Sequence, residues 1–457
     1  MPHTLLKTQQ EYFASGATLS VDNRVKALHH LRTVILRHEE ELLEALHLDL
    51  GKSAVESYMC EVGMVLEEIS YMVKHTRKFA KNRRVPSPLA QFRSRSYQKP
   101  SPKGCVLIMS PWNYPVLLTL GPLVDALAAG NTAIIKPSAY APHTAEVMKK
   151  LLEGAFDPRY IAVVTGGRQQ NRALLDLPFD HIFFTGSKEV GKTVMEAAAK
   201  HLTPVTLELG GKSPCIVTEK ADLKMAARRI AFGKYLNCGQ TCVAPDYLYV
   251  HQSVKDELMV LLRQEIEAQY GAQPLEREDW GKIINQRHFD RLADLIGRQQ
   301  AQVIHGGKHN ADRLQIEPTI LDNVTWNDPI MQEEIFGPIL PVLVYNELDE
   351  VLAAVQSHDR PLALYIFTQN KREADHVLTR CRFGGGCVND TVIHLATTYM
   401  GFGGVGESGM GSYHGKTGFD TFSHLKSIVD KAIWLDLPMR YKPYADWKDR
   451  LIRTFLR

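Results

Sequence analysis

The chain has 457 residues, of which 44% are hydrophobic, and these values predict two or three globular domains with substantial cores. Its 54 Lys and Arg residues nearly balance 51 Asp and Glu residues, which argues against binding nucleic acid or an anionic membrane through a basic field. The N-terminus lacks a signal-peptide pattern, no run reaches the about 18 apolar residues of a transmembrane segment, and the cysteines are few and scattered. We therefore expect a reduced, soluble, cytoplasmic protein.

The first predicted elements are helices. Residues 1–85 place apolar side chains at three- and four-residue spacing between charges, the pattern of amphipathic helices. Residues 86–103 are rich in Pro and Ser, and Pro cannot donate a hydrogen bond to a strand ladder. We therefore expect no central strand in 86–103, but a linker or an extended arm that reaches a partner subunit.

From residue 104 to 208, short β-rich runs alternate with helical stretches. The runs are 105–110, 132–138, 160–167, 181–187 and 203–211, and the helical stretches lie near 116–129, 144–152, 169–175 and 189–200. Five strands joined by helical crossovers predict a parallel, doubly wound sheet with ligand loops at the carboxyl ends of its strands.

A second α/β series occupies residues 209–400. Its predicted strands are 213–219, 247–252, 339–346, 362–370 and 387–391, and its predicted helices are 222–235, 253–268, 349–358 and 371–379. Two α/β domains with a cleft between them are the expected architecture. The tail, 401–457, is first Gly-rich and then ends in a basic amphipathic stretch, which favours a surface helix over a membrane anchor.

Two glycine motifs compete for the phosphate site. Residues 401–406, "GFGGVG", match G-x-G-x-x-G, but no strand precedes them and no helical pattern follows, so we expect a loop with several positive φ angles near the cleft. "FFTGSKEVGK" instead follows a strand and opens a helix, so backbone N–H groups at Gly186 and Ser187 are placed to face a pyrophosphate. Gly191 would permit close packing. An ordinary strand–turn–helix junction remains the alternative.

Three segments carry side chains suited to covalent catalysis. Cys242 in "NCGQTC" is a candidate nucleophile, although a buried structural cysteine is the alternative. Glu208 ends a strand in "TLELGGKSP", where a carboxylate can act as a general base through water. Asn113 in "SPWNYP" offers an amide donor for an oxyanion, and its aromatic neighbours Trp112 and Tyr114 can line an apolar pocket.

Together these segments resemble the aldehyde dehydrogenase superfamily. The resemblance rests on "PWNYP", "IIKPS", "FFTGS", "LELGGKSP", "NCGQTC", "QEEIFGP" and "GFGGVGESGMGSYHGKTGFDTFSH", and the short chain looks most like the class 3 branch. It implies an α/β fold: a doubly wound, Rossmann-like cofactor domain, with 1–85 as its helical part and 104–208 binding the dinucleotide. A second α/β catalytic domain, 209–400, and a small bridging or oligomerisation arm, 86–103, complete the implied fold. The tail 401–457 would supply a cleft loop, a bridging strand and the C-terminal helix, in a homodimer.

The resemblance also implies a reaction. Cys242 would attack an aldehyde, with Asn113 and the backbone N–H of Cys242 as the oxyanion hole. Hydride would pass to the nicotinamide of NAD or NADP, and Glu208 would activate water to hydrolyse the thioester. These reaction steps are chemically consistent, because hydride leaves readily once a thiolate has added to the carbonyl.

The implied cofactor contacts are distributed along the chain. Lys136 resembles the ribose ligand on the adenosine side, and Gly186, Ser187 and Gly191 resemble the pyrophosphate site. Glu334 and Phe336 resemble the clamp on the nicotinamide ribose, and Trp112 is expected along the cofactor cleft.

One departure from the family pattern concerns the choice of cofactor. Many members have an acidic residue where this chain has Ala139, and an acid there repels a 2′-phosphate. We therefore predict use of both NAD and NADP.

Other expectations concern the substrate and a second cysteine. Tyr114, Ile393 and His414, with His394 as a further candidate, are predicted to line an apolar tunnel for medium-chain or aromatic aldehydes. Exposed loop histidines are the alternative for His394 and His414. Cys238 is either a bystander or a redox partner of Cys242, and no metal site is expected because the spacing matches none.

Two other functions remain open. A CoA-acylating or reductive relative would release the acyl group differently, but it would not need a water-activating base such as Glu208. A non-catalytic dinucleotide-binding protein would be expected to lack Cys242, Glu208 or Asn113, and all three are present.

Overall fold

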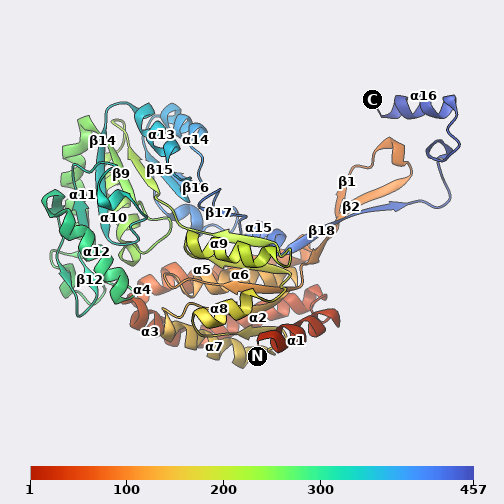
Figure 1. The fold of residues 1–457 in the computed structure, drawn as a ribbon, viewed down its shortest axis with the longest axis horizontal. Coiled ribbons are helices and arrows are strands. Elements are labelled where there is room, and N and C mark those ends of the chain that lie inside the picture. Colours follow the sequence, from red (N-terminus) through yellow and green to blue (C-terminus); the bar gives the residue numbers. More distant parts are fainter. Residues whose placement is uncertain (1, 457) are drawn as a thin grey trace.

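The structure, a computed structural model, describes residues 2–456. Met1 and Arg457, the end residues of the predicted segments 1–85 and 401–457, lie outside the described residues. Figure 1 shows a body of two α/β parts and a long arm that projects from it and continues to the C-terminal helix. Among residues 2–456, no helix is both long enough and apolar enough to cross a membrane.

The N-terminal segment is helical, as predicted. Its helices are α1 (Pro2–Ala14), α2 (Val21–Arg37), α3 (Glu39–Leu50), α4 (Ala54–Ser57) and α5 (Gly63–Phe79), with a π-helical turn at Tyr58–Val62. Ser20 and Ser53 accept hydrogen bonds from backbone N–H groups at the starts of α2 and α4, which satisfies donors that a helix leaves unpaired. The apolar faces of α2 and α5 pack into the main core.

The first sheet has six strands in the order β17-β7-β6-β3-β4-β5. The strands are β3 (Cys105–Met109), β4 (Thr132–Lys136), β5 (Ile161–Val163), β6 (His181–Thr185), β7 (Val205–Glu208) and β17 (Gly409–Met410). All pairings are parallel except β17 with β7. The helices α6 (Leu117–Ala129), α7 (Pro142–Ala155), α8 (Arg168–Leu175) and α9 (Lys188–Ala199) follow its strands.

The strand order of this sheet confirms the predicted doubly wound class. From β3 the chain runs outward to β4 and β5, and then returns to add β6 and β7 on the other side of β3. The order reverses between β3 and β6, and ligands of such sheets bind outside the carboxyl ends of strands at this point. The strands β3, β4 and β6 are fully buried and mostly apolar, as expected for a sheet covered on both faces.

The second sheet has seven strands in the order β10-β13-β14-β9-β8-β15-β16. They are β8 (Pro214–Val217), β9 (Tyr247–His251), β10 (Val303–His305), β13 (Thr319–Leu321), β14 (Ile339–Tyr345), β15 (Ala363–Phe367) and β16 (Gly385–Val388). The predicted helices appear as α10 (Leu223–Tyr235), α11 (Lys255–Tyr270), α13 (Leu348–Ser357) and α14 (Lys371–Arg380). The second α/β part of the prediction is therefore confirmed.

Several elements of this second part were not predicted. The largest is α12 (Gln286–Arg298), which buries Phe289, Leu292, Leu295 and Ile296. This spacing, with polar residues on the opposite face, is the pattern of an amphipathic helix, so the sequence carried a signal for α12 that the prediction did not use. The short strands β10 and β13 and the hairpin β11 (His309–Asn310) with β12 (Gln315–Ile316) were also missed, because two or three residues carry no periodic signal.

The arm corrects one prediction. Residues 94–102 form β2 (Ser94–Pro102), the middle strand between β1 (Arg83–Val85) and β18 (Ser423–Lys431), although its prolines argued against a central strand. The prolines are tolerated because β1 pairs only with residues 96–98, so Pro100 and Pro102 have a neighbour on one side only.

The chain ends beyond this arm. It continues to α16 (Asp446–Phe455), a helix with no buried residue that Figure 1 places far from the body. The predicted surface helix is therefore present within the described residues.

Candidate active site

A cleft of about 1870 Å³ is lined by residues of both α/β parts. Its wall on the first sheet includes the loops after β3 and β6 and the end of β7, the edge where a doubly wound sheet places its ligands. Its wall on the second part includes Cys242, Glu334 and Phe336. The cleft therefore brings together side chains that lie far apart in sequence.

Cys242 lies on a loop with an uncommon backbone. After α10 ends at Tyr235, Asn237 and Cys238 both adopt left-handed conformations (φ 52°, ψ 34°), and Gly239 follows with φ 71°. Left-handed residues other than glycine are uncommon and need surrounding contacts to hold them. A Cβ on Gly239 would lie 2.2 Å from the carbonyl oxygen of Gly337, so only glycine allows this close approach.

The Cys242 thiol is half-buried, and its surroundings favour the neutral form. Burial raises its pKa to about 12, and the carboxyl groups of Glu334 and Glu208 act in the same direction. Hydrogen bonds from the backbone N–H groups of Cys242 and Val243 partly oppose the rise in pKa. A nucleophilic thiolate at this position therefore requires a proton acceptor.

Glu208 is the last residue of β7 and is 3% exposed. Among the described residues, neither of its carboxylate oxygens has a hydrogen-bond partner, and burial raises its pKa well above the ordinary value. A buried carboxyl group without partners is costly for folding alone, and Glu208 lines the cleft. Its position suits a base that exchanges a proton with a molecule in the cleft.

Asn113, which follows β3, is 3% exposed and also lines the cleft. Its side-chain Nδ2 donates to the carbonyl oxygen of Gln240 at 3.0 Å, two residues before Cys242. One of its amide hydrogens is used in this bond, and the other remains for a ligand. The structure thus brings Asn113, Glu208 and Cys242 to one cleft.

The predicted dinucleotide residues lie along the same wall, with one exception. Lys136 ends β4, Gly186 follows β6 and Ser187 caps α9, and all three line the cleft. Gly191 does not line it: a Cβ there would lie 2.8 Å from Leu209 Cδ2, so Gly191 serves the packing of α9 on the loop after β7.

This wall fits an anionic dinucleotide. A Cβ on Gly186 would lie 2.5 Å from Phe184 Cζ, so glycine keeps the turn close to the sheet and the start of α9 open to an anion. Cationic side chains around the cleft include Lys136, Arg168, Lys188, Arg287 and Arg291. Burial lowers the pKa of Lys136 to about 8.

Glu334 and Phe336 line the second wall of the cleft, and Trp112 lines the first wall from the loop after β3. The Glu334 carboxylate packs directly over Gly210, the first glycine of "LELGG", because a Cβ there would lie 2.1 Å from its Oε2. Burial and the nearby Asp246 raise its pKa to about 8. Trp112 meets Phe336 edge to face at 5.4 Å between ring centroids.

The predicted substrate residues do not line the cleft. Tyr114 is buried, and its hydroxyl pairs with Thr241 Oγ1 at 2.6 Å. His414 is buried and pairs with Glu68 at 3.2 Å. Ile393 is 53% exposed. None of the three belongs to the cleft wall. Tyr114 and His414 each follow a residue that lines the cleft, and consecutive loop residues need not point to the same side.

Other residues form the apolar lining that was predicted for the substrate site. Leu118, Phe402 and Tyr413 line the cleft. Phe402 and Tyr413 belong to the Gly-rich segment after residue 400, where Gly409 pairs with Glu208 across the edge of the first sheet. In 401–406 only Gly406 has a positive φ, whereas several were expected, and a short helix, α15 (Gly415–Thr421), follows. The two aromatic residues among these glycines were the signal that sequence reasoning missed.

Cys238 is buried and its sulfur packs against Gly281, where a Cβ would lie 3.0 Å from Sγ. All seven cysteines are free thiols. A redox role of Cys238 stays a prediction. If peroxide inactivates Cys238→Ser in the same way as the unmodified protein, Cys238 has no such role. Within the described chain, no cluster of three His, Cys, Asp or Glu side chains is arranged as a metal site.

Comparison with known proteins identifies the family. The model of the aldehyde dehydrogenase family matches residues 3–428. The 4,4'-diaponeurosporen-aldehyde dehydrogenase of Staphylococcus aureus is 46% identical over 446 residues, 98% of this chain and 97% of the relative. Aldehyde dehydrogenase family 3 member A2 of Mus musculus is 42% identical over 458 residues, 100% of this chain and 94% of the relative. A solved structure of Staphylococcus aureus AldH in a substrate-bound state has a TM-score of 0.98 at 45% identity, with 100% of each chain covered.

The chain therefore belongs to the aldehyde dehydrogenase family. It is an oxidoreductase of aldehydes, and the family uses NAD(P). The resemblance predicted from the motifs, including its class 3 branch, is confirmed.

Proposed function

We propose that the protein oxidises apolar aldehydes, medium-chain aliphatic or aromatic, to carboxylic acids through a covalent intermediate on Cys242. The observation that carries this proposal is that one cleft is lined by a half-buried thiol and by a buried carboxylate that has no hydrogen-bond partner within residues 2–456.

The residues divide the reaction into two steps. The Cys242 thiol passes its proton to water in the cleft, and the sulfur forms a bond to the aldehyde carbon. The negative charge moves to the carbonyl oxygen beside Asn113 Nδ2 and the N–H of Cys242. Loss of hydride then leaves a thioester. Glu208 takes a proton from water, the water oxygen bonds to the thioester carbon, and the Cys242 sulfur leaves with the bonding electrons.

The hydride acceptor is a nicotinamide dinucleotide, which supplies the redox chemistry when it is bound. Lys136, Gly186 and Ser187 would hold its adenosine and pyrophosphate portions, and Glu334 and Phe336 would hold the nicotinamide ribose. Ala139 lines the cleft and brings no negative charge to the place of a 2′-phosphate, which supports use of both NAD and NADP. A preference for NAD of a hundredfold or more in kcat/KM would contradict this.

The preference for apolar aldehydes rests on the cleft wall. Leu118, Phe402 and Tyr413 line it, and apolar linings favour apolar ligands. The Staphylococcus aureus relative, whose name specifies 4,4'-diaponeurosporen-aldehyde, supports an apolar substrate.

We also propose a homodimer that forms through the arm. The strand β18 pairs with β2 over nine positions and carries the chain away from the body (Figure 1). Beyond it, Ile433 and Trp434 are 102% and 68% exposed. Large apolar side chains so exposed favour an interface. Sedimentation at several concentrations would show a dimer, and a monomer at all of them would refute the proposal.

The direct test of the function is an absorbance screen at 340 nm across aldehydes of increasing chain length, with NAD and with NADP, each with and without CoA. We expect NAD(P)H formation and a free carboxylic acid without CoA. A product that forms only with CoA would favour the acylating alternative, and a flat trace throughout would favour a non-catalytic binding protein.

A further inference from the structure

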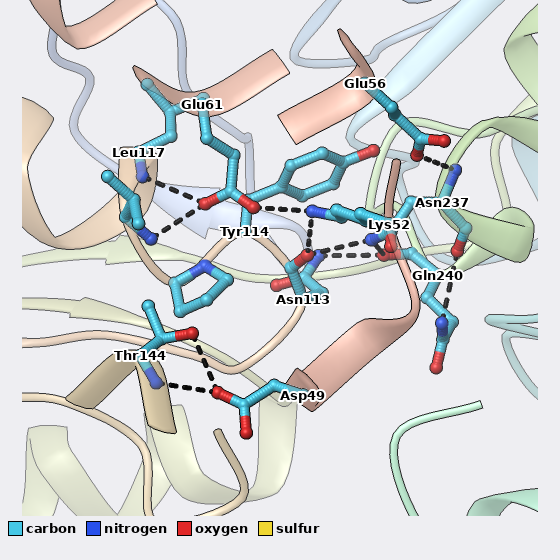
Figure 2. A network of polar contacts seen from close by, with 12 residues as sticks. Asp49, Lys52, Glu56, Glu61, Asn113, Tyr114, Leu117, Thr144, Asn237 and Gln240 are labelled. Carbon is cyan, nitrogen blue, oxygen red and sulfur yellow. Dashed lines mark hydrogen bonds and ion pairs between the residues drawn. The ribbon is translucent and has the colours of Figure 1, made fainter. Parts of the chain in front are cut away.

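We propose that a buried ion pair, Lys52 with Glu61, is a positioning device for the oxyanion hole. The inference rests on the proposed function, in that it takes Asn113 and the backbone N–H of Cys242 as the donors to the oxyanion. It concerns residues of the N-terminal helical segment that do not line the cleft. Figure 2 shows the contacts.

The pair is completely enclosed. Lys52 Nζ lies 2.5 Å from Glu61 Oε1, and the two side chains are 1% and 0% exposed. Lys52 also lies over the ring of Tyr114 at 4.1 Å from its centroid. Replacing such a pair by apolar residues of similar volume is often neutral for stability, so the fold alone does not require it.

The two charges hold the Asn113 loop at both of its ends. Lys52 Nζ donates to the backbone carbonyl oxygen of Asn113 at 3.0 Å. The second carboxylate oxygen of Glu61 accepts from the N–H groups of Val116 at 2.7 Å and Leu117 at 3.2 Å, where α6 begins. An apolar pair could not make any of these bonds. The loop from Asn113 to Leu117 is therefore fixed by one ion pair.

The same segment also holds the loop of the nucleophile. The carbonyl oxygen of Asn113 accepts a second hydrogen bond, from Asn237 Nδ2 at 2.8 Å, and the N–H of Asn237 donates to Glu56 Oε1 at 2.8 Å. Asn237 is one of the two left-handed residues that precede Cys242. Its Nδ2 and the Asn113 Nδ2 share the carbonyl oxygen of Gln240 as acceptor. Both halves of the oxyanion hole are thus tied to residues 52–61.

This arrangement has a specific chemical consequence. A misplaced oxyanion hole slows the attack of the Cys242 thiolate on a carbonyl, because that attack creates an oxyanion. It leaves alkylation of the same thiolate by iodoacetamide unchanged, because displacement of iodide creates none. A merely structural role would change both rates together or neither.

The test uses the double variant Lys52→Met/Glu61→Gln, which removes both charges of the pair together and keeps an oxygen acceptor for the N–H groups of Val116 and Leu117. Two rates are measured on Cys242: acylation by p-nitrophenyl acetate and alkylation by iodoacetamide. We expect the ratio of acylation to alkylation to fall by about tenfold or more. The KM for the dinucleotide should change little, and kcat for aldehyde oxidation should fall.

Two further variants serve as the positive and the negative control. Asn113→Ala removes the proposed donor itself and should lower the ratio at least as much. Lys255→Met/Asp322→Asn removes another enclosed ion pair, 2.7 Å long with both side chains 13% exposed, whose residues do not line the cleft, and it should leave the ratio unchanged.

The outcomes separate the two proposals. If Asn113→Ala lowers the ratio and the Lys52/Glu61 variant keeps it within twofold of the unmodified protein, the positioning role is wrong. If Asn113→Ala itself keeps the ratio, the proposed oxyanion hole is wrong. If the double variant does not fold, Lys52→Gln/Glu61→Gln removes both charges with polar side chains and decides the same question with the same two results.

Discussion

Glu208 and Glu61 are two glutamates with nearly the same burial, 3% and 0% exposed, in opposite electrostatic settings. Burial raises the pKa of both carboxyl groups. At Glu61 the rise is opposed by Lys52 and by hydrogen bonds from two backbone N–H groups, whereas burial alone acts on Glu208. The comparison teaches that burial does not decide a carboxylate's role: partners fix Glu61 in the scaffold, and their absence leaves Glu208 free to exchange protons.

The largest expected effect is the loss of kcat when Glu208 is replaced. Glu208→Gln should lower kcat by about 10²- to 10⁴-fold, because a general base contributes that much. The first turnover should persist as a burst of NAD(P)H, since thioester formation precedes the need for water. Stopped-flow absorbance measures both phases. Glu196→Gln, on the exposed face of α9, is the matched control, and a Glu208→Gln variant with kcat within a few-fold of that control would remove the assigned role.

The next effect belongs to Glu61. Lys52→Met alone should lower the free energy of unfolding by about 3–5 kcal/mol, because it leaves a buried carboxylate without its cation. Adding Glu61→Gln should recover much of that loss. Urea denaturation measures both. A single variant that loses less than about 1 kcal/mol would mean that the pair behaves like a surface ion pair.

A smaller effect tests the dinucleotide side of the cleft. Ala139→Glu places a carboxylate where a 2′-phosphate is expected, so kcat/KM for NADP should fall by about tenfold, equivalent to about 1.4 kcal/mol, while that for NAD is maintained. Steady-state kinetics with both cofactors measure the change. Equal losses for both cofactors would show that Ala139 does not discriminate between them.

The smallest effect concerns the pH dependence of stability. The raised pKa of Glu208 means that the folded protein keeps a proton that the unfolded chain releases above its ordinary pKa of about 4.3. The stability from this group is therefore complete below that value and is lost as pH rises toward the folded-state pKa, by at most about 1.4 kcal/mol per pH unit. Glu208→Gln should lack this loss, so the unfolding midpoint of the variant should rise relative to that of the unmodified protein between pH 5 and pH 8. A constant difference would show that Glu208 has an ordinary pKa.

The sequence was most informative where chemistry depends on strand ends. Glu208 lies at the end of one buried strand of a parallel sheet, and Asn113 lies just after another. The topology of such a sheet therefore predicted that both residues line the cleft. Tyr114 failed as a substrate residue because the residues of a loop do not alternate as those of a strand do, and its ring turned to Lys52. Pro100 and Pro102 misled because β1 is too short to reach them.

The network behind the cleft was outside the reach of sequence patterns. Lys52 and Asn113 are 61 positions apart, and Glu61 and Val116 are 55 apart. Glu61 lies in a stretch where helical periodicity gives a charged residue no reason to be buried. Only the packing of the N-terminal helices against α6 brings these groups together.

The most direct test of the central claim is mass spectrometry of Glu208→Gln after rapid mixing with an apolar aldehyde and NAD(P). The proposed mechanism predicts one acyl group per chain, attached to Cys242, at the end of the NAD(P)H burst. An unmodified Cys242 alongside NAD(P)H formation, or an acyl group on another residue, would contradict it.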